Sequence, residues 1–255
     1  MTLMPGPAQS MQRAWRRRHI RRFEESLGLP TLTEKFTARY GRKVIGGPFE
    51  GMDYIRESTG SVLIPKLLGS YEIEVASALD HIFAQSYDTI VDIGCAEGYY
   101  AVGLARRFPG ARVVAFDTDD HARRLCNEMA TLNRVADRVE VRGAADFATL
   151  SEVLRGKTLT VCDCDGCEAF LLDPNRVPPF RTGDLLVELH DHLDPAISST
   201  LRRNFDGSHH IREFSSRERN PGDWPALDFL TPEERKTAVG EYRPPQQWFF
   251  MTPRS

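Results

Sequence analysis

The chain has 255 residues, of which 41% are hydrophobic and 27% are charged, and its formal net charge at pH 7 is −3. This composition is ordinary for a globular domain, and the slightly acidic balance provides no global attraction to nucleic acid. No apolar run approaches the roughly 20 residues of a membrane span, and no apolar segment follows the cationic N-terminus as it would in a secretory signal. The five cysteines do not make a disulfide framework in a chain of this length, so we expect reduced thiols and a cytoplasmic protein.

Residues 11–27 have the apolar spacing of an amphipathic helix, and arginines occupy most of its remaining surface. Gly28 and Pro30 are expected to end this helix. One interpretation is an RNA-binding helix. The other is a helix that covers the core or a partner subunit and keeps its arginines in solvent. Because Glu24 and Glu25 follow the arginines and the whole chain is acidic, we favour the second interpretation.

Short helices and irregular segments are expected before the core domain. Thr31-Leu-Thr-Glu34 resembles a capping box that opens a short helix, which Gly41 ends. The glycine-rich residues 43–54 favour short strands and turns, and such segments beside a nucleotide-binding fold often form lids. We therefore expect residues 1–70 to form a helical and lid segment, which is also a candidate homodimer element. One core domain follows over residues 71–255.

The segment 89–107 contains a short apolar run rich in β-branched residues, then an acid and a small-residue turn, and then a helical pattern. This order of strand, tight loop and helix is how an α/β protein builds a nucleotide site. Gly94 and Gly98 permit backbone conformations and close approaches that a side chain would prevent. A nucleotide is therefore expected at this loop.

Three side chains in the loop indicate which nucleotide it suits. A dinucleotide-binding loop has a small residue, for close helix packing, where this chain has Tyr99. Asp92 and Glu97 flank the place where a pyrophosphate would lie, and two carboxylates favour a cation over an anion. The loop therefore suits a nucleoside without phosphates that carries an ammonium or sulfonium group, and S-adenosylmethionine is that ligand.

Val91-Asp-Ile-Gly-Cys-Ala-Glu-Gly98 resembles the first motif of class I S-adenosylmethionine-dependent methyltransferases, with Ala96 where a glycine is commoner. The resemblance implies an α/β, Rossmann-like fold in which a seven-stranded, mostly parallel sheet has helices on both faces. It also implies methyl transfer from S-adenosylmethionine, with S-adenosylhomocysteine as the product. The loop residues expected at the cofactor are Asp92, Gly94, Cys95, Ala96 and Gly98.

Asp117 ends the second expected strand, 19 residues after Gly98. An acid at this place accepts hydrogen bonds from ribose hydroxyls. An aspartate at a strand end more often caps a helix, but Asp119 or Asp120 can serve that purpose here. We therefore assign Asp117, with the neighbouring Thr118, to the cofactor.

Two further places are assigned to the cofactor by resemblance. Ala145 and Asp146 lie where the family reads adenine, which makes Asp146 a candidate acceptor for the exocyclic amine. Gly69-Ser-Tyr-Glu72 resembles a segment near the cofactor in the FkbM-type branch, so Tyr71 and Glu72 are candidates for the methionine end of the ligand. Both side chains could equally pack or cap the helix that follows.

The rest of the pattern alternates strands and helices as a doubly wound sheet does. Strands are expected over residues 112–117, 138–142, 158–163, 184–189, 209–214 and 247–251. Helices are expected from Ser70 to about Ala84, over residues 120–132 and 197–204, and from Thr231, which precedes a proline at the first helical position. In the resembling family the last strand is antiparallel and lies beside the sixth.

The fourth expected strand ends at Asp163, and strands of an open parallel sheet present functional residues at their carboxyl ends. Asp163 is therefore expected near the transferring methyl group, as a catalytic and a cofactor-binding candidate. The residues from Asp163 to Glu168 resemble the FkbM-type pattern Asp-x-Glu-Gly-x-Glu, with Asp165 in place of the first glutamate. This resemblance favours the small-molecule branch and identifies no substrate.

Three cysteines lie within six residues of one another, Cys162, Cys164 and Cys167. Their spacing is tighter than in usual zinc sites, and no second cysteine pair completes four ligands, so we expect Cys162 and Cys164 to pack as small hydrophobic side chains. The carboxylates Asp163, Asp165 and Glu168 could hold a magnesium ion that orients a substrate diol. The need for a metal stays open, and no metal ligand is assigned.

His190 follows the fifth expected strand and is the best candidate for a general base. Its ordinary pKa near 6.5 allows it to accept a hydroxyl proton at neutral pH, and Glu188 or Asp191 could orient it. The alternative is that His190 or His192 caps the following helix or contacts the lid. We favour catalysis by a small margin.

The predicted function is methyl transfer from S-adenosylmethionine to a small-molecule acceptor, most simply to a hydroxyl oxygen of a natural-product or sugar-like substrate. No Asn-Pro-Pro-Tyr-type motif follows the fourth strand, which argues against amine and nucleobase acceptors. Two alternatives remain, an RNA methyltransferase that uses the arginine-rich helix and a non-catalytic S-adenosylmethionine-binding subunit. A membrane partner is not expected, and nucleic acid is the less favoured partner.

Overall fold

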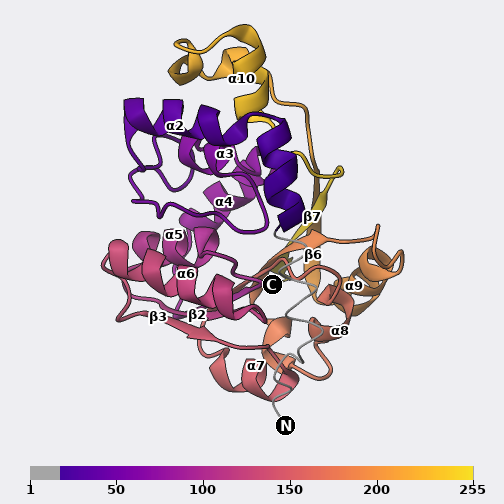
Figure 1. Cartoon of the computed structure of the whole chain (residues 1–255). Coiled ribbons are helices and arrows are strands. Elements are labelled where there is room, and N and C mark those ends of the chain that lie inside the picture. Colours follow the sequence, from indigo (N-terminus) through magenta and orange to yellow (C-terminus); the bar gives the residue numbers. More distant parts are fainter. Residues whose placement is uncertain (1–17, 255) are drawn as a thin grey trace. The chain divides into compact units, whose positions relative to one another are not determined.

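The computed structural model describes residues 18–254, so the predicted helix over residues 11–27 lies partly outside the described residues. The described chain divides into two compact units. Figure 1 colours the chain by residue number. The first unit contains the described residues up to Tyr71 together with Glu218–Tyr242, and the second contains Glu72–Arg217 and the chain from Arg243 onward. Within the described part of the chain, no helix combines the length and the apolar character that a membrane crossing requires.

The second unit is built on one seven-stranded sheet in the order β3-β2-β1-β4-β5-β7-β6. Its strands are β1 Thr89–Ile93, β2 Arg112–Phe116, β3 Val139–Arg142, β4 Thr158–Cys162, β5 Asp184–Leu189, β6 His209–Ser215 and β7 Gln247–Pro253. The strands β1 to β5 pair in parallel, and β7 is antiparallel to both β5 and β6. The predicted fold class and the antiparallel last strand are therefore confirmed.

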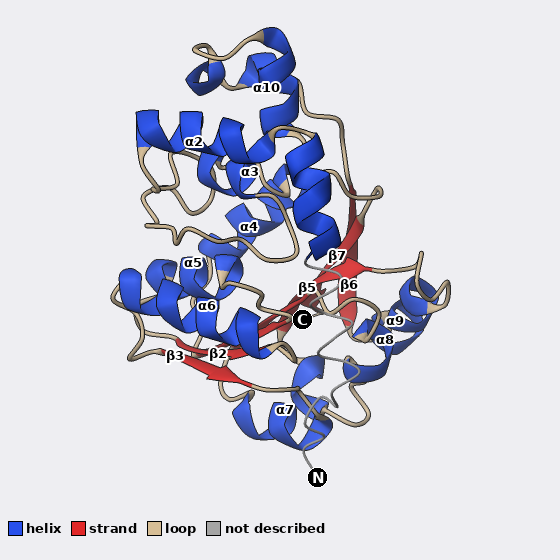
Figure 2. Ribbon diagram, in the orientation of Figure 1, coloured by secondary structure: helices blue, strands red, loops and turns tan. Residues whose placement is uncertain are grey.

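Helices cover both faces of this sheet, as Figure 2 shows for α5, α6 and α7. The helices α5 Tyr99–Arg107 and α6 Asp120–Leu132 pack against β1, β2 and β3. On the other face, α7 Phe147–Val153, α8 Glu168–Leu171 and α9 Ile197–Phe205 contribute to one apolar core with the central strands. Strands covered on both sides carry continuous apolar runs, and for this reason β1, β4 and β5 are buried along their whole length.

The register of the central strands brings three loops together. Ile93 at the end of β1 pairs with Cys162 of β4, and Cys162 pairs with Val187 of β5. The residues that follow these strands therefore emerge at one edge of the sheet, which is where open α/β sheets bind ligands. This edge carries the predicted site residues Asp163 and His190.

The first unit is mainly helical. It contains a helix over residues 18–26, α2 Leu29–Tyr40, α3 Leu63–Leu68, the short 3₁₀ segments η3 Pro221–Asp223 and η4 Pro225–Leu227, and α10 Pro232–Val239. The Tyr40 hydroxyl donates to the Ala226 carbonyl at 2.8 Å, and Lys35 pairs with Glu234 at 2.5 Å. These long-range contacts explain why residues 218–242 belong with the N-terminal helices, although the sequence placed them in the core domain.

Helix starts in the N-terminal half differ from the predictions. Helix α2 begins at Leu29 and not at a capping box, because Gly28 adopts a left-handed φ of 70° and Pro30 occupies the first turn. Gly41 ends this helix as predicted. The capping box expected at Thr31 was wrong, whereas Thr231 forms one with Glu234 at the start of α10.

The expected helix from Ser70 also starts later. A 3₁₀ segment, η1 Ile73–Val75, leads into α4 Ala76–Phe83, which has no side-chain cap. The chain reaches this point through Glu72, whose φ of 50° lies in the left-handed region. Between residues 43 and 54 a single isolated bridge joins Lys43 to Asp53, and the unpredicted helix α3 follows. All six residues of α3 are buried, so tertiary packing explains it better than local propensity.

Candidate functional site

The loop after β1 is shaped by two glycines. Gly94 has a φ of 88°, and a β-carbon there would lie 1.6 Å from the Asp163 carbonyl oxygen. Gly98 has a φ of 97°, and a β-carbon there would lie 2.9 Å from the Cys126 sulfur. Only glycine combines these left-handed conformations with such close approaches. The loop after β1 is therefore packed directly against the start of the loop after β4.

Asp117 lies directly after β2, beside the β1 loop, and its role toward a ribose stays a prediction. Its Oδ2 atom accepts a hydrogen bond from the Ala96 amide at 3.0 Å, and its Oδ1 atom accepts one from the Asp119 amide at 2.7 Å. Asp119 in turn caps α6 by accepting from the His121 amide. Asp117 is thus not the helix cap, and the exposed Thr118 follows it directly.

Asp92 is the buried acid of the β1 loop, with 2% of its surface exposed. Its Oδ2 atom has no hydrogen-bond partner among the described residues. Burial, reinforced by the negative charge of Asp163, raises the pKa of Asp92 to about 8. A nearby cationic ligand would offset both effects, because an opposite charge favours the ionised carboxylate.

The residues predicted at the adenine lie at the start of α7. Ala145 is half-buried and Asp146 is exposed. Asp146 caps α7 by accepting a hydrogen bond from the Thr149 amide at 2.7 Å, and this bond lowers the pKa of Asp146. One carboxylate oxygen is therefore engaged by the helix, and the role of Asp146 toward adenine stays a prediction.

A buried ion-pair cluster forms around Arg243, which the sequence did not single out. Its Nη1 atom lies 3.1 Å from Glu72 Oε1 and 3.0 Å from Glu188 Oε1. The Tyr100 hydroxyl donates to the other oxygen of Glu72. Glu72 was predicted at the methionine end of the ligand, together with Tyr71, whose ring in the first unit lies 5.0 Å from the Lys66 ammonium. Arg243 lies in a loop without a motif, so no sequence signal identified it.

His190 follows β5, and its ring is held by Glu168. Its Nδ1 atom lies 2.7 Å from Glu168 Oε1. Its Nε2 atom faces Asp163 Oδ1 at 3.5 Å and Asp165 Oδ1 at 3.8 Å. The ring is therefore oriented through Nδ1 and presents Nε2 toward the two aspartates.

The prediction that Glu188 or Asp191 orients His190 was wrong. Glu188 pairs with Arg243, and Asp191 accepts a hydrogen bond from the Ser198 amide at 3.0 Å near the start of α9. Glu168 reaches the imidazole because the loop after β4 lies beside the end of β5. The sequence signal for this contact is the final glutamate of the Asp-x-Glu-Gly-x-Glu pattern, which is Glu168.

Surplus negative charge sets the electrostatics of this edge. Burial lowers the pKa of His190, but the hydrogen bond to Glu168 and the charge of Asp163 outweigh it, and the net shift is upward. Burial and the charge of Glu72 raise the pKa of Asp163 to about 6. Burial and the charge of Asp163 raise the pKa of Glu188 to about 11. Asp163 and Glu188 are therefore not both ionised at neutral pH.

The donor atoms of Asp163, Glu188 and His190 lie within 4.8 Å of one another. Carboxylates with an imidazole suit a divalent cation such as zinc or manganese. Arg243 already places a positive charge on Glu188, however, and Asp163 is the member of this set that is partly exposed to solvent. The set is close enough to share a cation, and we assign it no metal.

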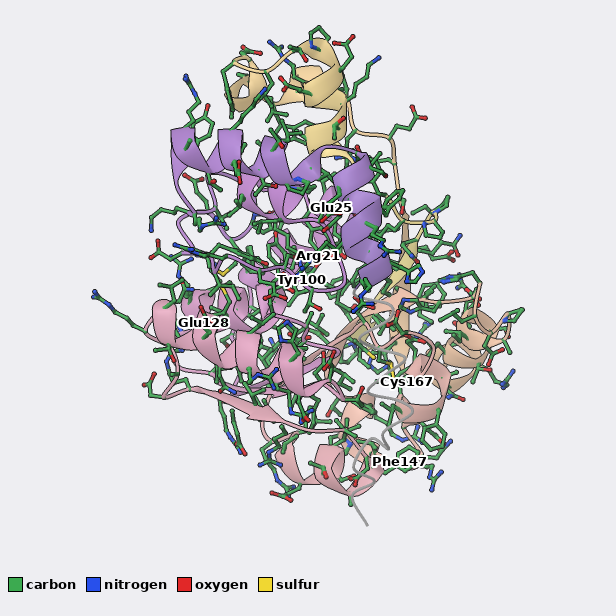
Figure 3. The ribbon with its side chains drawn as sticks, viewed as in Figure 1. Arg21, Glu25, Tyr100, Glu128, Phe147 and Cys167 are labelled. Carbon is green, nitrogen blue, oxygen red and sulfur yellow. A yellow bond between two sulfur atoms is a disulfide. The ribbon has the colours of Figure 1, made fainter. Side chains whose placement is uncertain are left out.

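Cys164 and Cys167 form a disulfide bond, with their α-carbons 5.6 Å apart. This corrects the expectation that every cysteine is a reduced thiol. Left-handed φ angles at Asp165 and Gly166 turn the chain so that the two sulfurs meet. Figure 3 labels Cys167 at this bond. The free cysteines in the described part of the chain are Cys95, Cys126 and Cys162, and all three are buried.

No protein-family model matches the chain. A curated relative, the release factor glutamine methyltransferase of Synechocystis sp., is 30% identical over 134 residues, which are 52% of this chain and 39% of that protein. The chain thus matches well under half of the length of this relative.

Solved structures with a similar course of the chain include an rRNA methylase from Streptococcus thermophilus, with a TM-score of 0.47 and 12% identity over 72% of this chain and 99% of that chain. A precorrin-6y C5,15-methyltransferase from Geobacter metallireducens has a TM-score of 0.46 and 12% identity over 71% of this chain and 90% of that chain. These likenesses do not bear on the acceptor. The strand order, with antiparallel β7 between β5 and β6, is that of the class I S-adenosylmethionine-dependent methyltransferase fold.

Proposed function

We propose that the protein is a methyltransferase that uses S-adenosylmethionine. The observation that carries this proposal is the buried Asp92 carboxylate, which has an oxygen without a hydrogen-bond partner among the described residues, in a loop shaped by Gly94 and Gly98. A buried acid with a raised pKa suits a ligand that brings its own positive charge. Asp117, next to the same loop, supplies carboxylate oxygens at the position expected for ribose hydroxyls.

The residues predicted for the cofactor lie at or after the ends of the strands β1, β2, β3 and, with Asp163, β4, and two more precede η1. The backbone of Gly94, Cys95 and Ala96 would approach the ligand closely, and Asp117 would accept from the ribose. Tyr71 and Glu72 remain our candidates for the methionine end, and Ala145 and Asp146 those for the adenine. When bound, S-adenosylmethionine supplies an electrophilic methyl group on a sulfonium.

We propose a hydroxyl oxygen of a small molecule as the acceptor. His190 Nε2 would take the hydroxyl proton, and Glu168 would hold the imidazole and stabilise its charged form. Asp163, on the same side as Nε2, would position the hydroxyl. The pattern from Asp163 to Glu168 supports an FkbM-type enzyme with a natural-product or sugar-like substrate.

A methyl-transfer assay would also detect other classes of acceptor. The relative named above acts, by its name, on glutamine of a release factor, and an amide acceptor would not need an imidazole base. An RNA acceptor would require binding to bulk RNA that weakens steeply with salt. A non-catalytic binding subunit would bind S-adenosylmethionine and S-adenosylhomocysteine and methylate nothing.

The test combines calorimetry with a methyl-transfer assay on hydroxylated small molecules, release factor protein and bulk RNA. We expect micromolar binding of both cofactor forms and S-adenosylhomocysteine formation with a hydroxylated acceptor. His190→Ala should lose about a hundredfold or more in turnover and keep cofactor affinity. His192→Ala is the matched control, because His192 is an exposed imidazole with its ring 5.6 Å away. Absence of binding to either cofactor form would refute the proposal.

Two further expectations accompany this function. The N-terminal segment remains a proposed homodimer element, which light scattering after gel filtration tests. A cytoplasmic location also remains a proposal, and it gives the disulfide described above a reducing environment.

A further inference from the structure

We propose that Cys164–Cys167 is a thiol–disulfide exchange site, opened by a dithiol reductant, whose redox state determines how firmly Glu168 is held against His190. The effect on turnover rests on the proposed function, whereas the effect on the loop does not. The disulfide is part of the loop between Asp163 and Glu168. Both of these acids face the imidazole of His190.

The loop is wrapped around one carboxylate oxygen. Glu168 Oε1 accepts from the Cys164 amide at 3.3 Å and from the Gly166 amide at 3.1 Å, and it lies 2.7 Å from His190 Nδ1. The amides that hold this oxygen therefore belong to residues inside the ring that the disulfide closes. The cross-link and the orientation of the catalytic imidazole depend on the same four-residue turn.

The turn is held both by its residues and by the cross-link. Asp165 has a φ of 54° and Gly166 a φ of 102°, so two successive residues are left-handed. Asp-Gly is a pair that adopts such angles readily. The disulfide adds a covalent constraint, because it fixes the two ends of this turn against each other.

The cystine is accessible, in contrast to the other cysteines. Cys164 and Cys167 are half-buried beside the exposed Asp165, while the three free cysteines are buried. The Cys162 sulfur lies 3.7 Å from that of Cys164. Burial and the charge of Glu168 raise the pKa of the Cys162 thiol. Since the thiolate is the attacking species, Cys162 is a poor internal nucleophile, and the disulfide is opened from solvent.

Exchange with an external dithiol opens the cystine in two steps. A thiolate of the external dithiol attacks one sulfur of the cystine, the sulfur–sulfur bond breaks, and the other sulfur leaves as a thiolate that takes up a proton. The second thiol of the reductant then resolves the mixed disulfide. Two electrons and two protons pass to Cys164 and Cys167, and the dithiol becomes a disulfide.

Amide hydrogen exchange measured by NMR tests the effect on the loop without any acceptor. In the oxidised protein, we expect the Gly166 and Cys164 amides to be protected by Glu168. Dithiothreitol should make both exchange on the order of tenfold faster or more, because the released turn opens more often. Alkylation and mass spectrometry should find three reactive thiols before reduction under denaturing conditions and five after it. Turnover should fall on the order of tenfold on reduction, because the imidazole is held less firmly.

Two variants make the test specific. Cys164→Ser/Cys167→Ser should exchange and turn over like the reduced protein and should no longer respond to dithiothreitol. Cys162→Ala removes the adjacent thiol but leaves the cross-link, and it should keep the full response. Five reactive thiols before reduction, or equal exchange of the Gly166 amide in both redox states, would overturn the proposal. If no acceptor is ever methylated but the exchange rates change with redox state, the proposed function fails and this inference stands.

Discussion

The loops after β1 and β4 both leave a buried strand at the same edge of the sheet, but they treat their acids differently. In the β1 loop, the buried Asp92 keeps an oxygen without a hydrogen-bond partner among the described residues. In the β4 loop, the buried Glu168 likewise keeps Oε2 without a partner among the described residues, but its Oε1 accepts from two amides and contacts the imidazole of His190. The first loop therefore suits a cation that arrives with a ligand, whereas in the second loop an imidazole already contacts the acid. This difference separates the proposed cofactor end from the proposed acceptor end.

Gly94→Ala should have the largest effect, because it acts where the two loops touch. The new β-carbon would lie 1.6 Å from the Asp163 carbonyl oxygen at a φ of 88°. The left-handed backbone costs about 1–2 kcal/mol and overpacking about 1–3 kcal/mol. Cofactor affinity should therefore fall about a hundredfold or more, as measured by calorimetry. Gly110→Ala, where no atom lies within 4 Å of the added carbon, is the matched control. Equal affinities for the two variants would refute the close packing of these loops.

Arg243→Ala tests how much the buried guanidinium stabilises the carboxyl groups of Glu72 and Glu188. It leaves the buried Glu72 carboxylate without its guanidinium, and removing one partner of a buried ion pair costs about 3–5 kcal/mol. Chemical denaturation should show that loss, and Arg243→Lys should recover part of it. Arg212→Ala, at an exposed arginine that bonds Ser77, should change stability by less than about 0.5 kcal/mol. Similar stabilities for Arg243→Ala and Arg212→Ala would mean that the cluster is hydrated.

The pH dependence of cofactor binding tests the β1 loop. In the free protein Asp92 keeps its proton up to a pKa of about 8, and a bound cation would favour the ionised form. Binding then releases a proton, so affinity should rise by up to about tenfold per pH unit below about pH 8 and level off above it. Calorimetry from roughly two pH units below this pKa to about one unit above it measures the slope. Asp92→Asn should bind more weakly and without the slope, and a slope that persists in that variant would assign it to another group.

The raised pKa of Asp92 also makes the stability of the folded protein depend on pH. The pKa of Asp92 is raised in the folded protein, so the unfolded chain loses this proton near pH 4 and the folded protein only near pH 8. The contribution of Asp92 to stability is therefore present below about pH 4 and is progressively lost as the pH rises toward about 8. Added cofactor should reduce this loss, since it binds the folded form with Asp92 ionised.

The functional residues of the β1 loop could be predicted from the sequence more fully than the contacts of the β4 loop. Asp92, Gly94 and Asp117 stand in a strand–loop–helix unit whose geometry is local, so their residue types and spacing indicate a nucleotide site. The contact of Glu168 with His190 joins residues from two strands that pair only in the folded sheet. Arg243 reaches Glu188 across 55 residues without any motif. The disulfide, in contrast, spans Asp165-Gly166, a pair that favours left-handed angles, so its turn could be predicted from the sequence.

Removal of metal ions should have the smallest effect. It tests whether a metal ion neutralises the carboxylates at the proposed acceptor end. Asp163, Glu188 and His190 are close enough to share a divalent cation. Arg243 lies 3.0 Å from Glu188, however, and a second cation there would be repelled by the guanidinium. Burial and Asp163 also raise the pKa of Glu188 to about 11, so a proton occupies this group at neutral pH. Turnover should therefore change less than about twofold after dialysis against EDTA, since the guanidinium and this proton already neutralise Glu188. If EDTA abolishes turnover and manganese or magnesium restores it, then the ion displaces that proton and His190 is a ligand rather than the base.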